Sequence, residues 1–345
     1  MSDTMAASES ATPVDGHPPA ADWEHLFYPE RNYEYFRQQL RLPANFHIAD
    51  PMTAAWMADA AMLAYGRSGP ELLAREKFNA VFDRSGLTCQ TIGEWSDTAR
   101  GTQAFFASNA DFAVLSFRGT ERNDWTDSLV DLTILPVRMD EDLPEPSSAN
   151  KTMLHLGLRN PLLNPFDHKE IGVHAGFQLA LNAVWPEVRS KLQSYSEANP
   201  GAPIFFTGHS LGAALATIAV ARCEHRNLAL FTFGSPRAGN TAFCEKVREK
   251  ADLGIYRFVD HQDLVTTVPP KDLFYSHTSG MMHIASNGDI SQDGDSEPPG
   301  ELRAIAKCLS EAAVAAKNLS AGSPPPELVD HSPSRYCYFT WRAAN

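Results

Sequence analysis

The hydrophobic pattern is clearest between Val173 and Asp260, where short apolar runs alternate with amphipathic stretches. Apolar residues recur at helical spacing from Phe177 to Leu192, so we expect one helix there, kinked at Pro186. Strands that alternate with helices indicate an α/β fold with a mostly parallel central sheet and helices on both faces. The same pattern predicts strands at Pro203–Thr207, Leu228–Phe233 and Gly254–Asp260, and helices at Leu211–His225 and Ala242–Lys250.

The preceding part of the chain carries weaker signals of the same kind. Ala54–Tyr65 is rich in strong helix formers and predicts a helix. Thr102–Phe106 and Asp111–Phe117 are apolar runs on either side of a polar turn, so they predict a β-hairpin. Residues 138–172 combine prolines with acidic residues, which indicates an insertion outside the core.

The two ends of the chain have distinct patterns. Residues 1–22 are rich in acidic residues, proline and alanine and predict a disordered leader, which leaves residues 23–345 as a single domain. Near the C-terminus, residues 286–300 are polar and predict a loop, and Leu302–Leu319 predicts an alanine-rich helix. The aromatic run Tyr336–Trp341 is interpreted as a strand-like segment.

Charge and cysteine content exclude several classes of protein. The formal net charge of −13 disfavours a nucleic-acid partner, because phosphates would be repelled. The five cysteines are scattered without any C-x-x-C pair, so we expect reduced thiols and no zinc site. A hydrophobic content of 43% is enough for a large core in a chain of 345 residues.

The sequence also bears on localisation. The first residues have neither a basic start nor an apolar core, so we expect no Sec signal peptide and a cytoplasmic chain, with signal-less export as the alternative. The longest strongly apolar stretch, Leu211–Ala221, is about half the length that spans a bilayer, which predicts no transmembrane segment. The pattern gives no indication of the oligomeric state.

The strongest chemical signal is Gly208-His209-Ser210-Leu211-Gly212, which fits G-x-S-x-G. A predicted strand precedes it and a predicted helix follows, as in the sharp turn that presents the nucleophilic serine of an α/β-hydrolase. Ser210 is therefore the expected nucleophile. The helix that follows also directs free N–H groups towards an oxyanion. His209 points away from its neighbour on such a turn, so we expect it to pack beneath Ser210.

A serine nucleophile needs a histidine base and a carboxylate that orients this base. In α/β-hydrolases the acid and then the histidine follow the serine along the chain, which leaves His277, His283 and His331 as candidate bases. His331, on a late loop, is the favoured one. Asp260 and Asp263 both lie where a strand ends, and Asp263 is better placed because it lies past the strand.

These motifs belong to a longer series of landmarks that resembles the class 3 lipases, the family of filamentous-fungal triacylglycerol lipases. The resemblance covers about residues 54–336 and implies an α/β-hydrolase fold with a lid segment. It agrees with Ser210, Asp263 and His331 as the catalytic triad. The matching landmarks are Phe117-Arg118-Gly119-Thr120, His174-Ala175-Gly176-Phe177, Thr207 to Gly212, Phe233 to Asn240, and Asp330-His331.

The resemblance implies further roles around the serine. Thr120 and Leu211 match the two residues whose backbone N–H groups form the oxyanion hole. Asn123-Asp124-Trp125 matches the start of the lid, so residues 121–135 are expected to cover the site away from lipid. An amphipathic lid of this kind opens when a lipid interface replaces the burial of its apolar side.

The implied activity is lipase action on triacylglycerol esters through an acyl-enzyme, at a lipid–water interface and without a metal or cofactor. Phospholipase A1, a short-chain or feruloyl esterase and a membrane-attacking effector remain alternatives within the hydrolases. A catalytically silent interaction protein on the same scaffold is the alternative from another class. The sequence departs from the secreted, disulfide-bonded fungal members and carries longer segments before His174 and between Asp263 and His331.

Overall fold

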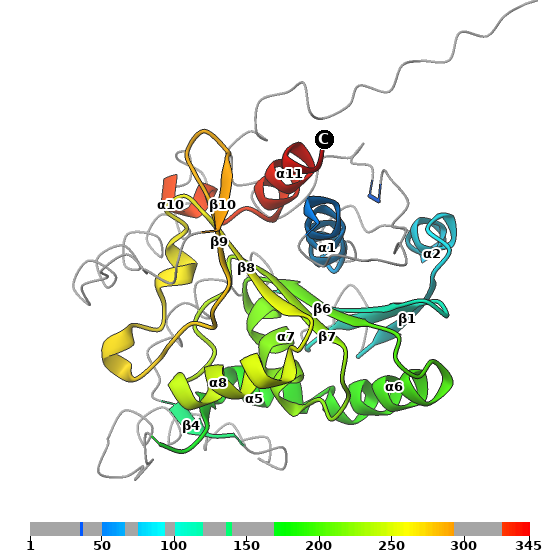
Figure 1. The fold of residues 1–345 in the computed structure, drawn as a ribbon, viewed down its shortest axis with the longest axis horizontal. Coiled ribbons are helices and arrows are strands. Elements are labelled where there is room, and N and C mark those ends of the chain that lie inside the picture. Colours follow the sequence, from blue (N-terminus) through cyan, green and yellow to red (C-terminus); the bar gives the residue numbers. More distant parts are fainter. Residues whose placement is uncertain are drawn as a thin grey trace, which may run out of the picture.

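The computed structural model describes residues 35–36, 50–65, 75–93, 101–119, 136–139, 169–292 and 326–345. A single eight-stranded sheet runs through this part of the chain, with helices on both of its faces (Figure 1). The expected α/β architecture with a mostly parallel sheet is confirmed. The predicted leader, the lid and the helix at Leu302–Leu319 lie outside the described residues.

The sheet has a parallel centre and antiparallel edges. Strands β3, β6, β7, β8 and β9 are parallel neighbours, while β1, β2 and β3 form an antiparallel meander at one edge and β9 and β10 a hairpin at the other. The strands are β1 (Thr88–Ile92), β2 (Ala104–Ser108), β3 (Ala113–Phe117), β6 (Ile204–His209), β7 (Leu228–Phe233), β8 (Gly254–Asp260), β9 (Met281–Ile284) and β10 (Ile290–Gln292).

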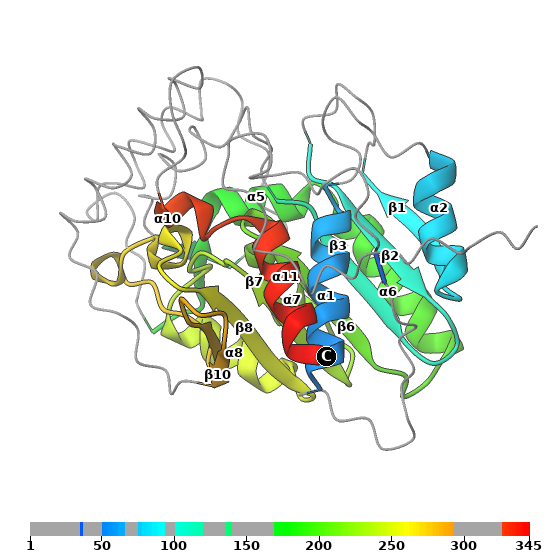
Figure 2. The same cartoon turned by 90° about the horizontal axis from the view of Figure 1, so that it is seen from above.

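Two long helices from opposite ends of the chain cover one face. Helix α1 (Pro51–Leu63) lies next to α11 (Pro333–Ala344), and α2 (Arg75–Arg84) packs near β1 (Figure 2). Almost every residue of α1 is buried, because one side meets the sheet and the other meets α11. The buried Asp59 of α1 accepts hydrogen bonds from Trp341 Nε1 at 2.9 Å and from Phe36 N–H at 2.8 Å.

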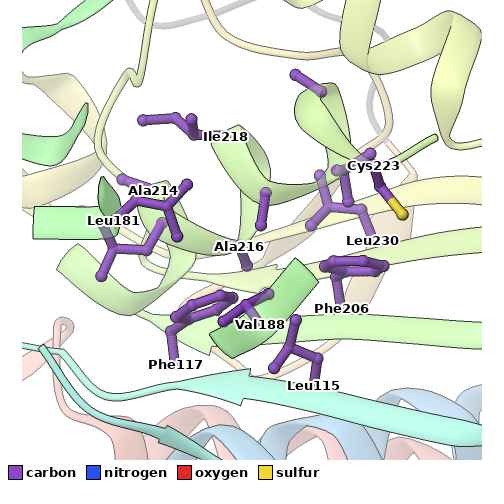
Figure 3. Packing of buried hydrophobic residues seen from close by; sticks show 14 of the residues in the cluster. Leu115, Phe117, Leu181, Val188, Phe206, Ala214, Ala216, Ile218, Cys223 and Leu230 are labelled. Carbon is purple, nitrogen blue, oxygen red and sulfur yellow. The ribbon is translucent and has the colours of Figure 1, made fainter. Parts of the chain in front are cut away.

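Among the described residues, four helices cover the opposite face, and α7 lies most directly on the sheet. Its small and branched residues pack on Leu115, Phe206 and Leu230 of three neighbouring strands (Figure 3). Alanine-rich packing of this kind lets the helix approach closely, which fixes the height of its N-terminus above the strands. The helices are α5 (Ala175–Asn182), α6 (Trp185–Ala198), α7 (Leu211–Arg222) and α8 (Thr241–Lys250).

Three predicted elements differ from the structure. The single kinked helix over Phe177–Leu192 is wrong, because α5 and α6 are separate helices and Pro186 lies in the first turn of α6, where a missing N–H costs nothing. The aromatic run Tyr336–Trp341 is part of helix α11 rather than strand-like, because Pro333 starts a helix whose apolar side docks on α1. Helix α7 ends at Arg222, before the predicted end.

The predicted loop at residues 286–300 and the predicted insertion at residues 138–172 both contain parts of short strands. Within residues 286–300, β10 forms a hairpin with β9 around Gly288, whose φ of 83° suits glycine. The predicted insertion 138–172 begins and ends in a small antiparallel pair, β4 (Pro136–Arg138) with β5 (Gly172–His174), and its middle lies outside the described residues. The described helices include none long and apolar enough to cross a membrane.

Candidate active site

Ser210 occupies the turn between β6 and α7, as the sequence predicted. Its φ of 57° and ψ of −127° are a rare backbone conformation for a residue with a side chain. Its N–H donates to the carbonyl of Phe233 on the adjacent strand at 3.0 Å, which fixes the turn against β7. The residue is 5% exposed. A strained serine at a strand-to-helix turn, held in place by its neighbours, is the expected geometry of a nucleophile elbow.

The two glycines of the motif are needed because the elbow is tightly packed. A methyl group at Gly208 would overlap the backbone of Gly212, and one at Gly212 would overlap the carbonyl of Phe117. The strand, the helix and the end of β3 therefore meet in a space that admits no side chain at either glycine. This contact is the physical reason for the spacing of the motif.

His331 and Asp263 form a direct pair although they lie 68 residues apart in sequence. The imidazole Nδ1–H donates to the carboxylate, with distances of 2.9 Å to Oδ2 and 3.0 Å to Oδ1. Both side chains are almost completely buried. His331 lies between α10 (Pro326–Val329) and α11, and Asp263 lies between β8 and the short helix η2 (Leu264–Thr267).

The carboxylate of Asp263 is also held from two other directions. The N–H of Val265 donates to Oδ1 at 2.9 Å, and the hydroxyl of Tyr336 donates to Oδ2 at 2.7 Å. The same hydroxyl accepts the N–H of Asp260 at 3.0 Å. Charge-assisted hydrogen bonds of this kind fix the rotamer of a buried carboxylate, so the acid is presented to His331 in one orientation.

The His331–Asp263 pair and the turn of Ser210 both lie at the end of β7. Ser210 is bonded to Phe233, and the next residue, Gly234, lies against the pair: a methyl group there would be 2.7 Å from Asp263 Oδ2 and 2.9 Å from His331 Nδ1. Gly234 has a φ of 58° as well. The structure thus brings the three predicted residues of the triad to one edge of the sheet.

His209 packs beneath the elbow, as predicted, and it contacts the base directly. Its Nε2–H donates to the backbone carbonyl of His331 at 2.7 Å, and its Nδ1 accepts the hydroxyl of Tyr65 at 2.9 Å. The two imidazole rings have centroids 4.5 Å apart. Burial, followed by the proximity of His331, lowers the pKa of His209 well below its usual value, so the ring stays neutral and connects the elbow to the loop of the base.

The predicted oxyanion hole is described only in part. Leu211 is the first residue of α7, directly after Ser210, so its N–H lies at the positive end of the helix. Gly119 comes close to the elbow, because a methyl group on it would be 2.7 Å from the carbonyl of His209. Thr120 follows Gly119 but lies outside the described residues, as do Asn123, Asp124 and Trp125 of the predicted lid.

The alternative candidates for the base and the acid have other partners. His277 is bonded through Nε2 to the carbonyl of Thr266 at 2.6 Å, and His283 is part of strand β9. Asp260 accepts Arg335 Nε at 2.8 Å, and burial raises the pKa of its carboxyl to about 7 despite the opposing effect of Arg335. His331 and Asp263 therefore stay the expected base and acid, bonded to each other rather than to these residues.

Two functional contacts were not foreseen from the sequence. The sequence predicts Tyr336 in a strand-like segment, yet its hydroxyl binds the carboxylate of Asp263 from a helix. Tyr65 was placed at the end of a helix, yet its hydroxyl binds His209. Had residues 333–344 been predicted as a helix, the helical spacing would have placed Tyr336 on the same side as the buried residues. This spacing is the sequence signal that could have identified Tyr336.

The part of the chain that the structure describes contains no cluster of histidine, cysteine or acidic residues able to hold a metal ion. Four of the five cysteines are free thiols there, and Cys308 lies outside the described residues.

Comparisons with known proteins find similarity to lipases. Residues 114–273 match the sequence profile of the family described as Lipase (class 3). The secreted mono- and diacylglycerol lipase 1 of Fusarium solani is 38% identical over 110 residues, which is 31% of this chain and 33% of that protein. Lipase A of Sodiomyces alcalophilus is 31% identical over 193 residues, or 50% of this chain and 42% of the relative.

The matches thus span only about a third to two fifths of the length of these curated relatives. Among solved structures, a fungal lipase superposes with a TM-score of 0.53 at 22% sequence identity, covering 88% of this chain and all of that chain. At that identity the superposition supports the fold.

Proposed function

Because residues 114–273 match the class 3 lipase family, we propose that this chain is a serine carboxyl-ester hydrolase that cleaves acylglycerol esters. The observation that carries the proposal is the buried His331–Asp263 pair beside the strained Ser210 elbow. A hydroxyl of ordinary reactivity becomes a nucleophile when an oriented imidazole takes its proton.

In the first half of the proposed reaction, Ser210 Oγ attacks the ester carbonyl while His331 accepts the hydroxyl proton through Nε2. Asp263 holds the proton on Nδ1, so Nε2 is the unprotonated nitrogen that can act as the base, and the carboxylate stabilises the imidazolium that forms. The negative charge on the carbonyl oxygen is met by the N–H of Leu211 and, as the family resemblance implies, that of Thr120.

In the second half, the tetrahedral intermediate collapses and His331 returns its proton to the departing alcohol. The acyl group then remains on Ser210 as an ester. A water molecule loses its proton to His331, attacks this ester and releases the fatty acid and the free serine. Each proton that His331 takes is given back, so the enzyme ends the cycle unchanged.

The proposed substrate class rests on the relatives rather than on the site geometry. Relatives with matching sequence are described as mono- and diacylglycerol lipases or as lipases. We propose that residues 121–135 act as a lid and that the substrate is taken from a lipid–water interface. A panel of mono-, di- and triacylglycerols, a phospholipid and short-chain esters tests this choice. Preference for the phospholipid or for feruloyl esters would replace the acylglycerol assignment.

The direct test is the variant Ser210→Ala assayed on p-nitrophenyl butyrate. We expect kcat to fall by at least about 10³-fold, because the remaining site has no nucleophile. The circular dichroism spectrum is expected to stay unchanged, since alanine fits the same turn. Covalent labelling by a fluorophosphonate probe should occur in the wild-type chain and be absent in the variant. Undiminished turnover in the variant, or a wild-type chain that neither turns over nor labels, would contradict the proposal.

A further inference from the structure

Arg335 joins the two chain segments that carry the acid and the base. Its Nε donates to Asp260 Oδ2 at 2.8 Å, and its Nη2 lies 3.1 Å from Asp330 Oδ1. Asp260 ends β8 shortly before Asp263, and Asp330 directly precedes His331. One guanidinium in the first turn of α11 therefore binds the residue directly before His331 and a residue three positions before Asp263.

Asp330 completes the connection. Its other oxygen, Oδ2, accepts the N–H of Gln262 at 3.2 Å and lies 3.2 Å from His261 Nδ1. Gln262 is the residue immediately before Asp263. The residue before the base is thus bonded to the residue before the acid, so a shift of either segment would be transmitted to the other.

The same arrangement fixes the position of Tyr336. Arg335 and Tyr336 are consecutive in α11, and Tyr336 donates to the carboxylate of Asp263 while it accepts the N–H of Asp260. The guanidinium also lies over the ring of Phe339, with its central carbon 5.1 Å from the ring centroid. The Arg335 side chain is 14% exposed. Its guanidinium is therefore held by the two carboxylates and the aromatic ring together.

The ion pair with Asp260 is costly for the fold. Asp260 is fully buried, and its Oδ1 has no hydrogen-bond partner among the described residues. The raised pKa of this carboxyl, about 7, reflects the same burial. Buried ion pairs add little net stability compared with apolar residues of similar size, which favours a role in geometry over a role in stability.

We propose that Asp260, Arg335 and Asp330 form a brace that sets the position of the His331 imidazole relative to Asp263 and Ser210. Arg335 is the positioning residue of this brace. The inference rests on the proposed ester hydrolysis at Ser210. Catalytic geometry tolerates little displacement, since a misplacement of about 1 Å can lower a rate about 10²-fold.

The test compares Arg335→Met with the wild-type full-length chain on p-nitrophenyl butyrate, a soluble ester that bypasses the lipid interface. We expect kcat per titrated active site to fall at least about tenfold while KM changes less than about threefold, since the imidazole is displaced and the acyl groove is not. Arg335→Lys should give an intermediate kcat, because an ammonium is a point charge that replaces only part of the fork.

Arg342→Met is the matched control. Arg342 lies on the same helix two turns further on, where its Nη1 donates to the carbonyl of Asn287 at 2.8 Å and its Nη2 lies 3.8 Å from Asp289. It contacts neither segment of the catalytic pair in these bonds. We expect its kcat to match that of the wild-type chain.

The inference is wrong if Arg335→Met keeps a kcat within about twofold of the wild-type chain, even when its melting temperature falls, since the brace predicts a larger loss. If Arg335→Met does not fold, Asp330→Asn replaces it. We then expect a kcat at least about fivefold lower than that of the wild-type chain, and an unchanged kcat would contradict the brace.

A wild-type chain without Ser210-dependent turnover would contradict the proposed function instead. An active wild-type chain with an unaffected Arg335→Met variant would contradict the brace alone.

Discussion

At the scale of single residues, the site combines a strained backbone conformation at Ser210 with polar side chains that are hydrogen-bonded to several partners. Ser210 keeps its rare φ and ψ because strand, helix and the end of β3 close around it. Asp263 accepts hydrogen bonds from a backbone N–H, a tyrosine hydroxyl and an imidazole. The serine turn is thus specified locally, while the carboxylate depends on residues far along the chain.

Tyr336→Phe tests the hydroxyl that binds this carboxylate. The phenyl ring keeps the packing on His209 and Phe233, but the donor to Asp263 Oδ2 is lost. We expect kcat on p-nitrophenyl butyrate to fall about tenfold, because a hydrogen bond to a charged group contributes about 1.5–3 kcal/mol. Tyr338→Phe, the same change two residues further on in α11, serves as the control. Equal activity of the two variants would show that the Tyr336 hydroxyl has no role.

At the scale of elements, the site depends on the docking of the two helices that come from opposite ends of the chain. α11 carries Arg335 and Tyr336 in its first turns and Trp341 near its end, where the indole binds the buried Asp59 of α1. α1 in turn packs on β6, the strand that ends at the elbow. The acid and base are therefore held by a helix whose position is fixed by the distant helix α1.

Trp341→Phe tests this docking. The variant leaves the carboxylate of Asp59 with one donor fewer in a buried environment, and it removes part of an indole ring from the core. We expect the free energy of unfolding to fall by about 2–4 kcal/mol, measured by urea denaturation. The kcat of the remaining folded chain should change little, because the hydrogen bond that is lost joins Trp341 to Asp59 and not to Asp263 or His331. An unchanged denaturation midpoint would mean that the Asp59–Trp341 contact does not stabilise the docking.

At the scale of the whole molecule, burial couples stability to pH in two opposite directions. Burial lowers the pKa of both His209 and His277, so their contribution to stability is present above about pH 6.5 and is lost as the pH falls, when only the unfolded chain takes the protons. Burial raises the pKa of Asp260 to about 7, so its contribution is present at low pH and is lost as the pH rises towards 7. As the pH falls from 6 to 5, the loss of stability from the two histidines exceeds the gain from the one carboxyl. The three groups together therefore destabilise the fold over this range.

His277→Gln isolates the contribution of one histidine to the pH dependence of stability. His277 lies outside the triad and is bonded to the carbonyl of Thr266; its pKa is lowered by burial first and then by the charges of Arg257, Arg237 and Lys271. Glutamine keeps a donor but does not titrate. Between pH 6 and 5, we expect the variant to lose less stability than the wild-type chain, by about 1 kcal/mol. Parallel pH dependences of the two chains, measured by chemical denaturation, would contradict this, and above pH 7 their difference should stay constant.

The sequence by itself determined the elements with strong local periodicity and the position of the nucleophile. β7 and β8 have the predicted limits, and the glycine spacing around Ser210 follows from contacts within one strand–turn–helix unit. Chain order and the end of β8 were enough to favour Asp263 and His331. These features can be predicted from the sequence because each depends on neighbouring residues or on the order of elements along the chain.

Only the tertiary structure decided how the rest of the site is built. The run Tyr336–Trp341 has the composition of a strand, but docking on α1 makes it helical and turns Tyr336 and Arg335 back towards the acid. The partners of Asp59, His209 and Asp330 likewise come from distant segments. Local propensity contains no information on which buried polar groups will meet, since their pairing is imposed by the close packing of helices on both faces of one sheet.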